Sequence, residues 1–177
     1  MDLLKYIRNV PDFPIDGIQF KDITTLIQDP KALKETLDIM AKRYKKMKID
    51  KIVSMEARGF IFGAALAYLI DAGFVPIRKP GKLPYKTEEY TYEKEYGSDT
   101  LTMHVDAIKP GEKVLILDDL LATGGTALAA AKLSEKLKGD VVEMGFVIEL
   151  TGSLKGREVL EKEGYKIWSI LEIEVDE

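Results

Sequence analysis

The chain has 177 residues, 46% of them hydrophobic and 32% charged, a composition that favours one globular domain spanning residues 1–177. The formal net charge of −4 argues against a nucleic-acid-binding protein, because contacts to phosphate backbones need clustered Lys and Arg. Cysteine is absent, no apolar run reaches the ~18 residues of a membrane span, and the N-terminus lacks a signal-peptide pattern, so we expect a cytoplasmic protein without disulfides, thiolate metal sites or membrane contact.

Helical and strand patterns alternate along most of the chain. Apolar residues at helical spacing predict a helix over 29–48, where Asp-Pro is typical of a helix start. Further helices are predicted at 59–73, closed by Gly73, and at 126–139 and 154–164. Short runs rich in branched apolar residues predict strands at 51–55, 74–79, 101–105, 113–117, 141–150 and 165–173.

This alternation predicts an α/β fold with a mostly parallel central sheet flanked by helices on both faces. In such sheets ligands bind at the carboxyl ends of the strands. Four segments directly follow a predicted strand and are therefore the candidates for a binding site: EARG (56–59), RKPGKLPY (78–85), DDLLATGGT (118–126) and ELTG (149–152).

The third of these segments has the composition of a phosphate-binding loop. Paired glycines allow backbone amides to approach a ligand at a helix start, where free N–H groups and the helix dipole favour an anion. Threonine hydroxyls add further donors. The predicted phosphate site comprises Ala122, Thr123, Gly124, Gly125 and Thr126.

Two adjacent carboxylates, Asp118 and Asp119, stand beside this loop. An ionised carboxylate only accepts hydrogen bonds, so the pair would repel a phosphate but suit hydroxyl groups. The ligand would then carry a phosphate next to a diol, as ribose 5-phosphate does. The alternative is an ordinary strand–helix turn with two solvated aspartates.

A family resemblance rests on this loop and on several other segments. VLILDDLLATGGT (114–126) resembles the phosphoribosyl diphosphate (PRPP) signature of type I phosphoribosyltransferases. The segments FPIDGIQFKDITTLIQDP, EARGFIFGAALA, RKPGKLPY, EYG and ELTGSLKGREVL follow the order and spacing of the family's adenine-specific branch. The resemblance implies the type I phosphoribosyltransferase fold, with a small N-terminal hood over about residues 1–30 and a flexible loop over about 79–100.

The resemblance also implies a diphosphate site. The turn Glu56-Ala57-Arg58 would hold the diphosphate through a cis Glu56–Ala57 peptide bond, although relatives often have Asp and Ser at the first two positions. The basic loop carrying Arg78, Lys79 and Lys82 would neutralise the leaving group. In the family this loop lies near a subunit interface, which implies a homodimer. Taken alone, both segments could be surface turns.

The implied base pocket lies between the hood and the ELTG segment. Phe20 would stack on adenine, Leu150 would press on its other face, and main-chain groups near Gln19 and Lys21 would read its edge. Relatives often have Arg in place of Lys21. Taken alone, Phe20 and Leu150 could equally be core residues. The single histidine, His104, is interpreted as structural.

The family's catalytic glutamate precedes Tyr-Gly, which places it at Glu95, with Tyr96 as a lid side chain. Glu93 is the internal competitor, because residues two apart point to the same face of an extended segment. Without the resemblance, this segment would be interpreted as a charged, solvated hairpin.

The implied reaction transfers the 5-phosphoribosyl group from PRPP to adenine, giving AMP and diphosphate, as in purine salvage. Mg²⁺ would be held mainly by oxygens of PRPP and diphosphate, with no protein ligand directly assigned. One alternative is a phosphoribosyltransferase for another purine base, such as hypoxanthine or xanthine. Another is a non-catalytic PRPP sensor of the purine-repressor type, which would need a DNA-binding segment that this sequence lacks.

Overall fold

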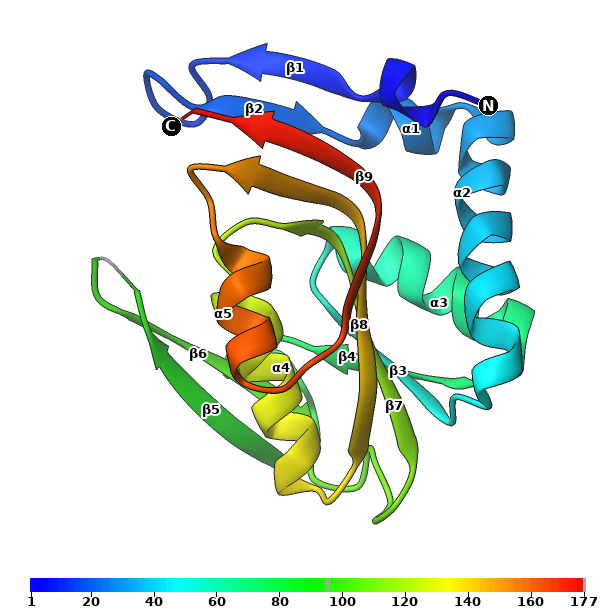
Figure 1. The fold of residues 1–177 in the computed structure, drawn as a ribbon. Coiled ribbons are helices and arrows are strands. Elements are labelled where there is room, and N and C mark those ends of the chain that lie inside the picture. Colours follow the sequence, from blue (N-terminus) through cyan, green and yellow to red (C-terminus); the bar gives the residue numbers. More distant parts are fainter. Residues whose placement is uncertain (95, 177) are drawn as a thin grey trace.

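A five-stranded sheet forms the centre of the molecule in the computed structural model, which describes residues 1–94 and 96–176 (Figure 1). Its strand order is β4-β3-β7-β8-β9, and every neighbouring pair is parallel. The strands are β3 (Lys51–Met55), β4 (Gly73–Ile77), β7 (Lys113–Leu121), β8 (Asp140–Gly152) and β9 (Ile167–Val175). The predicted fold class is confirmed.

Helices cover both faces of this sheet (Figure 1). One face packs against α1 (Thr24–Gln28), α2 (Pro30–Tyr44) and α3 (Arg58–Ile70), and the other against α4 (Gly125–Lys136) and α5 (Gly156–Lys162). Strand β7 shows why both faces are apolar. Its Val114 and Ile116 join the hydrophobic cluster under α4, whereas Leu115 and Leu117 join the cluster under α2 and α3. A strand buried on both sides therefore reads as a continuous apolar run.

Two hairpins extend from this central body. The first, β1 (Arg8–Pro11) with β2 (Gln19–Asp22), follows the short 3₁₀ helix η1 (Leu3–Tyr6) and lies at the end of the molecule toward which β8 and β9 run (Figure 1). The second, β5 (Thr87–Glu93) with β6 (Ser98–His104), forms a long antiparallel arm within and just beyond residues 79–100. Another 3₁₀ helix, η2 (Lys45–Met47), follows α2. No helix in the described ranges is both long and apolar enough to cross a membrane.

Several elements differ from the sequence predictions. Helix α3 ends at Ile70, where Asp71 takes a left-handed conformation with φ of 57°, so Gly73 opens β4 rather than closing the helix. Strand β7 continues to Leu121 and therefore includes the aspartate pair. Elements β1, β2 and α1 were not predicted, and neither was β5, in whose sequence TEEYTYE only Tyr90 and Tyr92 supply apolar surface. Helix α2 begins as predicted, with the Asp29 carboxylate accepting hydrogen bonds from the backbone amides of Lys31 and Ala32 at 2.9 Å.

An ion pair joins α2 to the sheet beneath it. The Arg43 guanidinium donates two hydrogen bonds of 2.7 Å to the Glu143 carboxylate, whose side chain is only 4% exposed. Its Cζ atom lies 4.9 Å from the centre of the Trp168 ring. The forked geometry and the aromatic contact fix α2 against β8 and β9.

We expect Arg43→Met to lower the free energy of unfolding by about 2–3 kcal/mol, because it leaves the Glu143 carboxylate buried without its partner. Urea denaturation measures this loss. The matched control is Lys34→Met, which breaks the exposed Lys34–Asp38 pair and should cost less than about 0.5 kcal/mol. Equal losses in the two variants would contradict the role assigned to burial.

Candidate active site

The carboxylates of Asp118 and Asp119 occupy the carboxyl-terminal part of β7. The Asp119 backbone amide donates a 2.8 Å hydrogen bond to Asp118 Oδ1, which holds that side chain in place. Helix α3 approaches so closely here that a Cβ on Gly59 would lie 2.7 Å from the same oxygen. The glycine of EARG is therefore needed to let the start of α3 reach the aspartate pair.

The two carboxylates differ in electrostatic environment. Burial, reinforced by the neighbouring charge of Asp119, holds the pKa of Asp118 well above the usual aspartate range. Asp119 instead forms an ion pair with Arg58, whose Nε lies 2.7 Å from its Oδ2. The pair thus combines one carboxyl group held toward its neutral form with one that has a cation beside it.

The phosphate loop closes around a small cavity of about 210 Å³. Gly124 takes a φ of 89° immediately before α4, a conformation that favours glycine, and so turns the chain into the helix. The cavity is lined by Arg58, Phe146 and the consecutive residues 118–127. The structure thus brings all seven predicted phosphate and ribose residues to one cavity: Asp118, Asp119, Ala122, Thr123, Gly124, Gly125 and Thr126.

A second cavity, of about 410 Å³, joins the EARG turn to the same aspartates. It is lined by Met55, Glu56, Ala57, Arg58, Asp118, Asp119 and Thr126. The Glu56–Ala57 peptide bond is cis, as expected from the family resemblance. The turn predicted for diphosphate therefore lies next to the groups predicted for ribose.

The Glu56 carboxylate gathers the basic residues of the neighbouring loop. It accepts hydrogen bonds from Arg78 Nε at 2.9 Å and the Lys79 backbone amide at 3.2 Å, and Lys82 Nζ lies 3.4 Å away. Although burial acts to raise it, these hydrogen bonds and charges lower the pKa of Glu56. Glu56 thus holds together the side chains of Arg78 and Lys82, two of the predicted diphosphate-binding cations.

In the hood, the side chain of Phe20 meets Arg58 and Phe13. The Arg58 Cζ atom lies 5.5 Å from the centre of the Phe20 ring, and the Phe13 ring packs edge-on at 5.1 Å. Leu150 lies near the carboxyl end of β8, packed against the cluster under α2 and α3. The part-buried Phe20 therefore connects the hood to the cavity that contains Asp119.

The side chains of Gln19 and Lys21 are both held by Asn9 on the opposite strand. Asn9 Nδ2 donates to Gln19 Oε1 at 2.7 Å, and Lys21 Nζ donates to Asn9 Oδ1 at 2.6 Å. This engagement is compatible with base recognition through the backbone of β2, as the sequence analysis expects.

On the arm, Tyr92 was missed by sequence reasoning. Its hydroxyl lies 3.3 Å from Thr126 Oγ1, and its ring would lie 3.3 Å from a Cβ on Gly125. A larger cavity of about 850 Å³ lies between the arm and the phosphate loop, with Glu93 and Tyr96 in its lining. The alternation of tyrosines in YTY was the available signal. Glu95, the predicted catalytic residue, lies outside the described residues.

His104 has a structural contact. Its Nε2 accepts a 3.3 Å hydrogen bond from the Tyr85 backbone amide, and the two rings pack at 6.2 Å. Within residues 1–94 and 96–176, no group of three or more His, Cys, Asp or Glu side chains is arranged to hold a metal ion.

A parallel sheet with an acidic pair at the end of one strand, a glycine-rich helix start beside it and a hood above is the arrangement of a phosphoribosyltransferase. The family model described as phosphoribosyl transferase domain matches residues 22–176. A curated relative from Alkaliphilus oremlandii, named adenine phosphoribosyltransferase, is 54% identical over 98% of this chain and 99% of its own length.

Solved structures give the same result. The adenine phosphoribosyltransferase of Thermoanaerobacter pseudethanolicus matches with a TM-score of 0.92 and 50% identity over 97% of this chain and 98% of its own. That of Rhodothermus marinus matches with a TM-score of 0.90 and 48% identity over 97% and 96%. The chain therefore belongs to the adenine phosphoribosyltransferase family, an enzyme family of pentosyltransferases that serves purine salvage. The family resemblance and the enzyme class expected from the sequence are confirmed.

We expect Asp118→Asn to weaken turnover and to stabilise the fold. Turnover should fall about 10-fold or more, because Asn replaces one carboxyl oxygen with an NH2 group that cannot accept a hydrogen bond from a ribose hydroxyl. Since the native pKa of Asp118 is raised, the native state binds this proton more tightly than the unfolded chain does. The contribution of Asp118 to the free energy of unfolding of the wild-type protein is therefore present at low pH and is lost as pH rises through the native pKa.

The measurement is the melting temperature of both proteins from about pH 4 to about pH 8, together with steady-state kinetics. The melting temperature of Asp118→Asn relative to wild type should increase with pH. A constant difference, or wild-type kinetics in the variant, would contradict the environment described for Asp118.

Proposed function

We propose that this chain transfers the 5-phosphoribosyl group of PRPP to adenine, giving AMP and diphosphate. The observation that carries the proposal is the shared lining of neighbouring cavities by the aspartate pair, the phosphate loop and the EARG turn. This shared lining supports a site in which acceptors for a diol, donors for a phosphate and cations for a leaving diphosphate surround one ribosyl group. Residues 1–177 act as one domain, with the hood in about 1–30 and the flexible loop in about 79–100.

Each set of residues has a separate task in this reaction. Residues 122–126 and the N-terminus of α4 hold the 5-phosphate, while Asp118 and Asp119 accept hydrogen bonds from the ribose hydroxyls. Arg58 and the cations gathered by Glu56 face the diphosphate. Adenine lies between Phe20 and Leu150, with backbone groups of Gln19 and Lys21 reading its edge.

The bond from the ribosyl carbon to the diphosphate oxygen breaks as the bond to adenine N9 forms. Positive charge develops on the ribosyl carbon, and the proton on N9 passes to Glu95. Tyr96, with a side chain 88% exposed and lining the large cavity, is the lid residue that covers the site when the arm closes.

The residues present fit a magnesium ion that is held mainly by the substrate. Mg²⁺ usually binds through one or two carboxylates plus substrate phosphates, and Asp119 is paired with Arg58 rather than standing in an acidic cluster. When bound, the ion neutralises charge on the diphosphate. Asp118 and Asp119 orient the ribose oxygens. The proposed location of the protein is the cytoplasm.

The deciding experiment is product formation from PRPP with adenine, hypoxanthine or xanthine as the acceptor. We expect AMP and diphosphate from adenine and little product from the 6-oxo purines. The 6-amino group of adenine needs a hydrogen-bond acceptor on the protein, whereas a 6-oxo group needs a donor. Comparable turnover of hypoxanthine would contradict adenine specificity and favour a phosphoribosyltransferase for another purine base. Retention of a DNA duplex in a gel-shift assay, without turnover of any base, would favour a PRPP-sensing regulator.

We expect Glu95→Gln to lower kcat by about 10²–10⁴-fold with little change in PRPP affinity, because it removes the acceptor for the N9 proton. Steady-state kinetics measure both quantities. Glu93→Gln is the matched control, since Glu93 is exposed at the end of β5, and it should have a much smaller effect. Equal, small effects of Glu95→Gln and Glu93→Gln would contradict the role of Glu95 and indicate that solvent or diphosphate accepts the N9 proton.

A homodimer is the proposed assembly. Helix α3, which begins at Arg58, exposes an apolar face that includes Ile61 at 41%, Tyr68 at 85% and Leu69 at 38%. A second copy placed against this face would lie along the helix whose first residue, Arg58, belongs to the EARG turn. Burying such side chains on association is favourable by about 25 cal/mol per Å² of apolar surface.

We expect Tyr68→Glu to shift the protein toward monomer, because it places a charge on the apolar face of α3 at its most exposed residue. Sedimentation velocity over a concentration series measures the shift. The matched control is Leu4→Glu, an exposed apolar residue on η1 at 48%. The proposed interface on α3 would be wrong if the Tyr68→Glu variant is as dimeric as wild type. It would also be wrong if the wild-type protein is a monomer.

A further inference from the structure

The hood hairpin joins the body at its root. Among the strands that the structure describes, β1 and β2 pair with each other and belong to a separate two-stranded sheet. Arg8 lies opposite Asp22 in the last pair of this ladder before the chain enters α1. Immediately beyond, Ile23 and Leu26 are buried at 2% and 0% exposure. The hairpin therefore extends from a fixed base, and its angle depends on the residues at that base.

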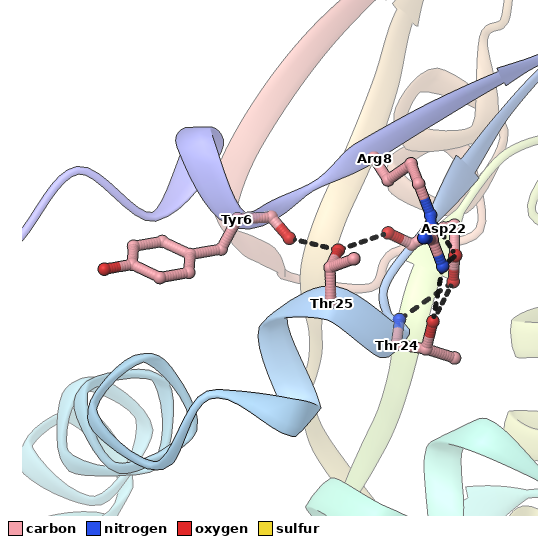
Figure 2. Close-up of polar contacts among 5 residues, drawn as sticks. All are labelled: Tyr6, Arg8, Asp22, Thr24 and Thr25. Atoms are coloured by element: carbon pink, nitrogen blue, oxygen red, sulfur yellow. Dashed lines mark hydrogen bonds and ion pairs between the residues drawn. The ribbon is translucent and has the colours of Figure 1, made fainter.

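A cluster of polar contacts lies at this root (Figure 2). Asp22 Oδ2 accepts from Arg8 Nε at 2.9 Å and Nη2 at 2.6 Å. Asp22 Oδ1 accepts from the Thr24 backbone amide at 2.9 Å and its hydroxyl at 2.7 Å. We call Arg8, Asp22 and Thr24 the root cluster. It joins the first strand of the hood, its second strand and the first residue of α1 through one carboxylate.

The next residue extends this connection to the start of the hood. The Thr25 hydroxyl donates to the Tyr6 carbonyl oxygen at 2.5 Å and lies 3.4 Å from the Asp22 carbonyl oxygen (Figure 2). Hydrogen bonds from Thr24 and Arg8 lower the pKa of Asp22 to about 2, so the carboxylate is ionised at neutral pH. Charge-assisted bonds of this kind are shorter and stronger than neutral ones.

The root cluster lies two residues from Phe20 along the same strand. Side chains two apart in a strand point to the same face, so Asp22 and Phe20 share one face of β2. The Phe20 ring is otherwise in contact with Phe13 toward the hairpin tip and with Arg58 across the cavity. A change of angle at the root would therefore move Phe20 relative to Arg58 and to any base beneath the hood.

We propose that Asp22 and Arg8 are positioning residues for the base, which set the height and angle of the hood so that Phe20 stacks on adenine. The inference rests on the proposed function. Asp22 does not touch the reacting atoms, and the aspartate pair, phosphate loop and diphosphate cations all lie outside the hood. Loss of the root cluster should consequently weaken adenine binding selectively.

The test is steady-state kinetics of Asp22→Asn with each substrate varied in turn. We expect KM for adenine to rise about 10-fold, the scale of a lost charge-assisted hydrogen bond. KM for PRPP and kcat at saturating adenine should stay within about twofold. The matched control is Asp38→Asn, which breaks an exposed ion pair on α2 and should leave all three constants unchanged.

Arg8 provides an independent variant. Arg8→Ala removes the fork to Asp22 but leaves the hydrogen bonds from Thr24. It should therefore raise KM for adenine by no more than Asp22→Asn does, and the double variant should be no worse than Asp22→Asn alone. Arg8→Lys keeps the charge but loses the fork, so its effect should be intermediate. This milder variant decides the question if Asp22→Asn fails to fold.

Unchanged KM for adenine in these variants, or an equal rise in KM for PRPP, would overturn the positioning role. Turnover of adenine by the wild-type protein distinguishes a failure of this inference from a failure of the proposed function. A wild-type protein that does not use adenine overturns both, whereas normal wild-type turnover with an insensitive root cluster overturns only the inference.

Discussion

The site depends on the ion pair between Arg58 and Asp119. Two adjacent carboxylates at the end of a buried strand are costly, because burial and mutual repulsion both disfavour their ionised forms. The structure meets this cost in two ways: Arg58 places a cation 2.7 Å from Asp119, and Asp118 is held toward its neutral form by burial and its neighbour. Removing the cation would leave the strand end with uncompensated charge.

Arg58 also connects three parts of the molecule. It is the first residue of α3, it belongs to the turn predicted for diphosphate, and its guanidinium lies over the Phe20 ring of the hood. The close packing of Gly59 against Asp118 fixes where this helix begins. One side chain is thus in contact with residues proposed for ribose and for the base, and it belongs to the turn proposed for diphosphate.

The sequence predicted the central sheet well, because buried parallel strands such as VLIL are continuous apolar runs and the helices between them are strongly periodic. It also identified the aspartate pair and the phosphate loop from residue chemistry. It missed β5, because only Tyr90 and Tyr92 supply apolar surface in the charged segment TEEYTYE. Nor could it pair Tyr92 with Thr126 or Arg8 with Asp22, because those contacts depend on tertiary placement. Family resemblance, rather than residue chemistry, supplied the base pocket and Glu95.

The position of Glu56 has a consequence for product release. Its carboxylate already neutralises Arg78 and Lys82 and accepts from the Lys79 backbone amide. At the diphosphate site proposed above, an entering diphosphate would replace the Glu56 carboxylate as the partner of these cations, and its binding free energy would be only the difference between the two interactions. The Glu56 carboxylate would pair with the cations again when the diphosphate leaves. This carboxylate would thus keep the binding groups in place between turnovers and limit the affinity for the product.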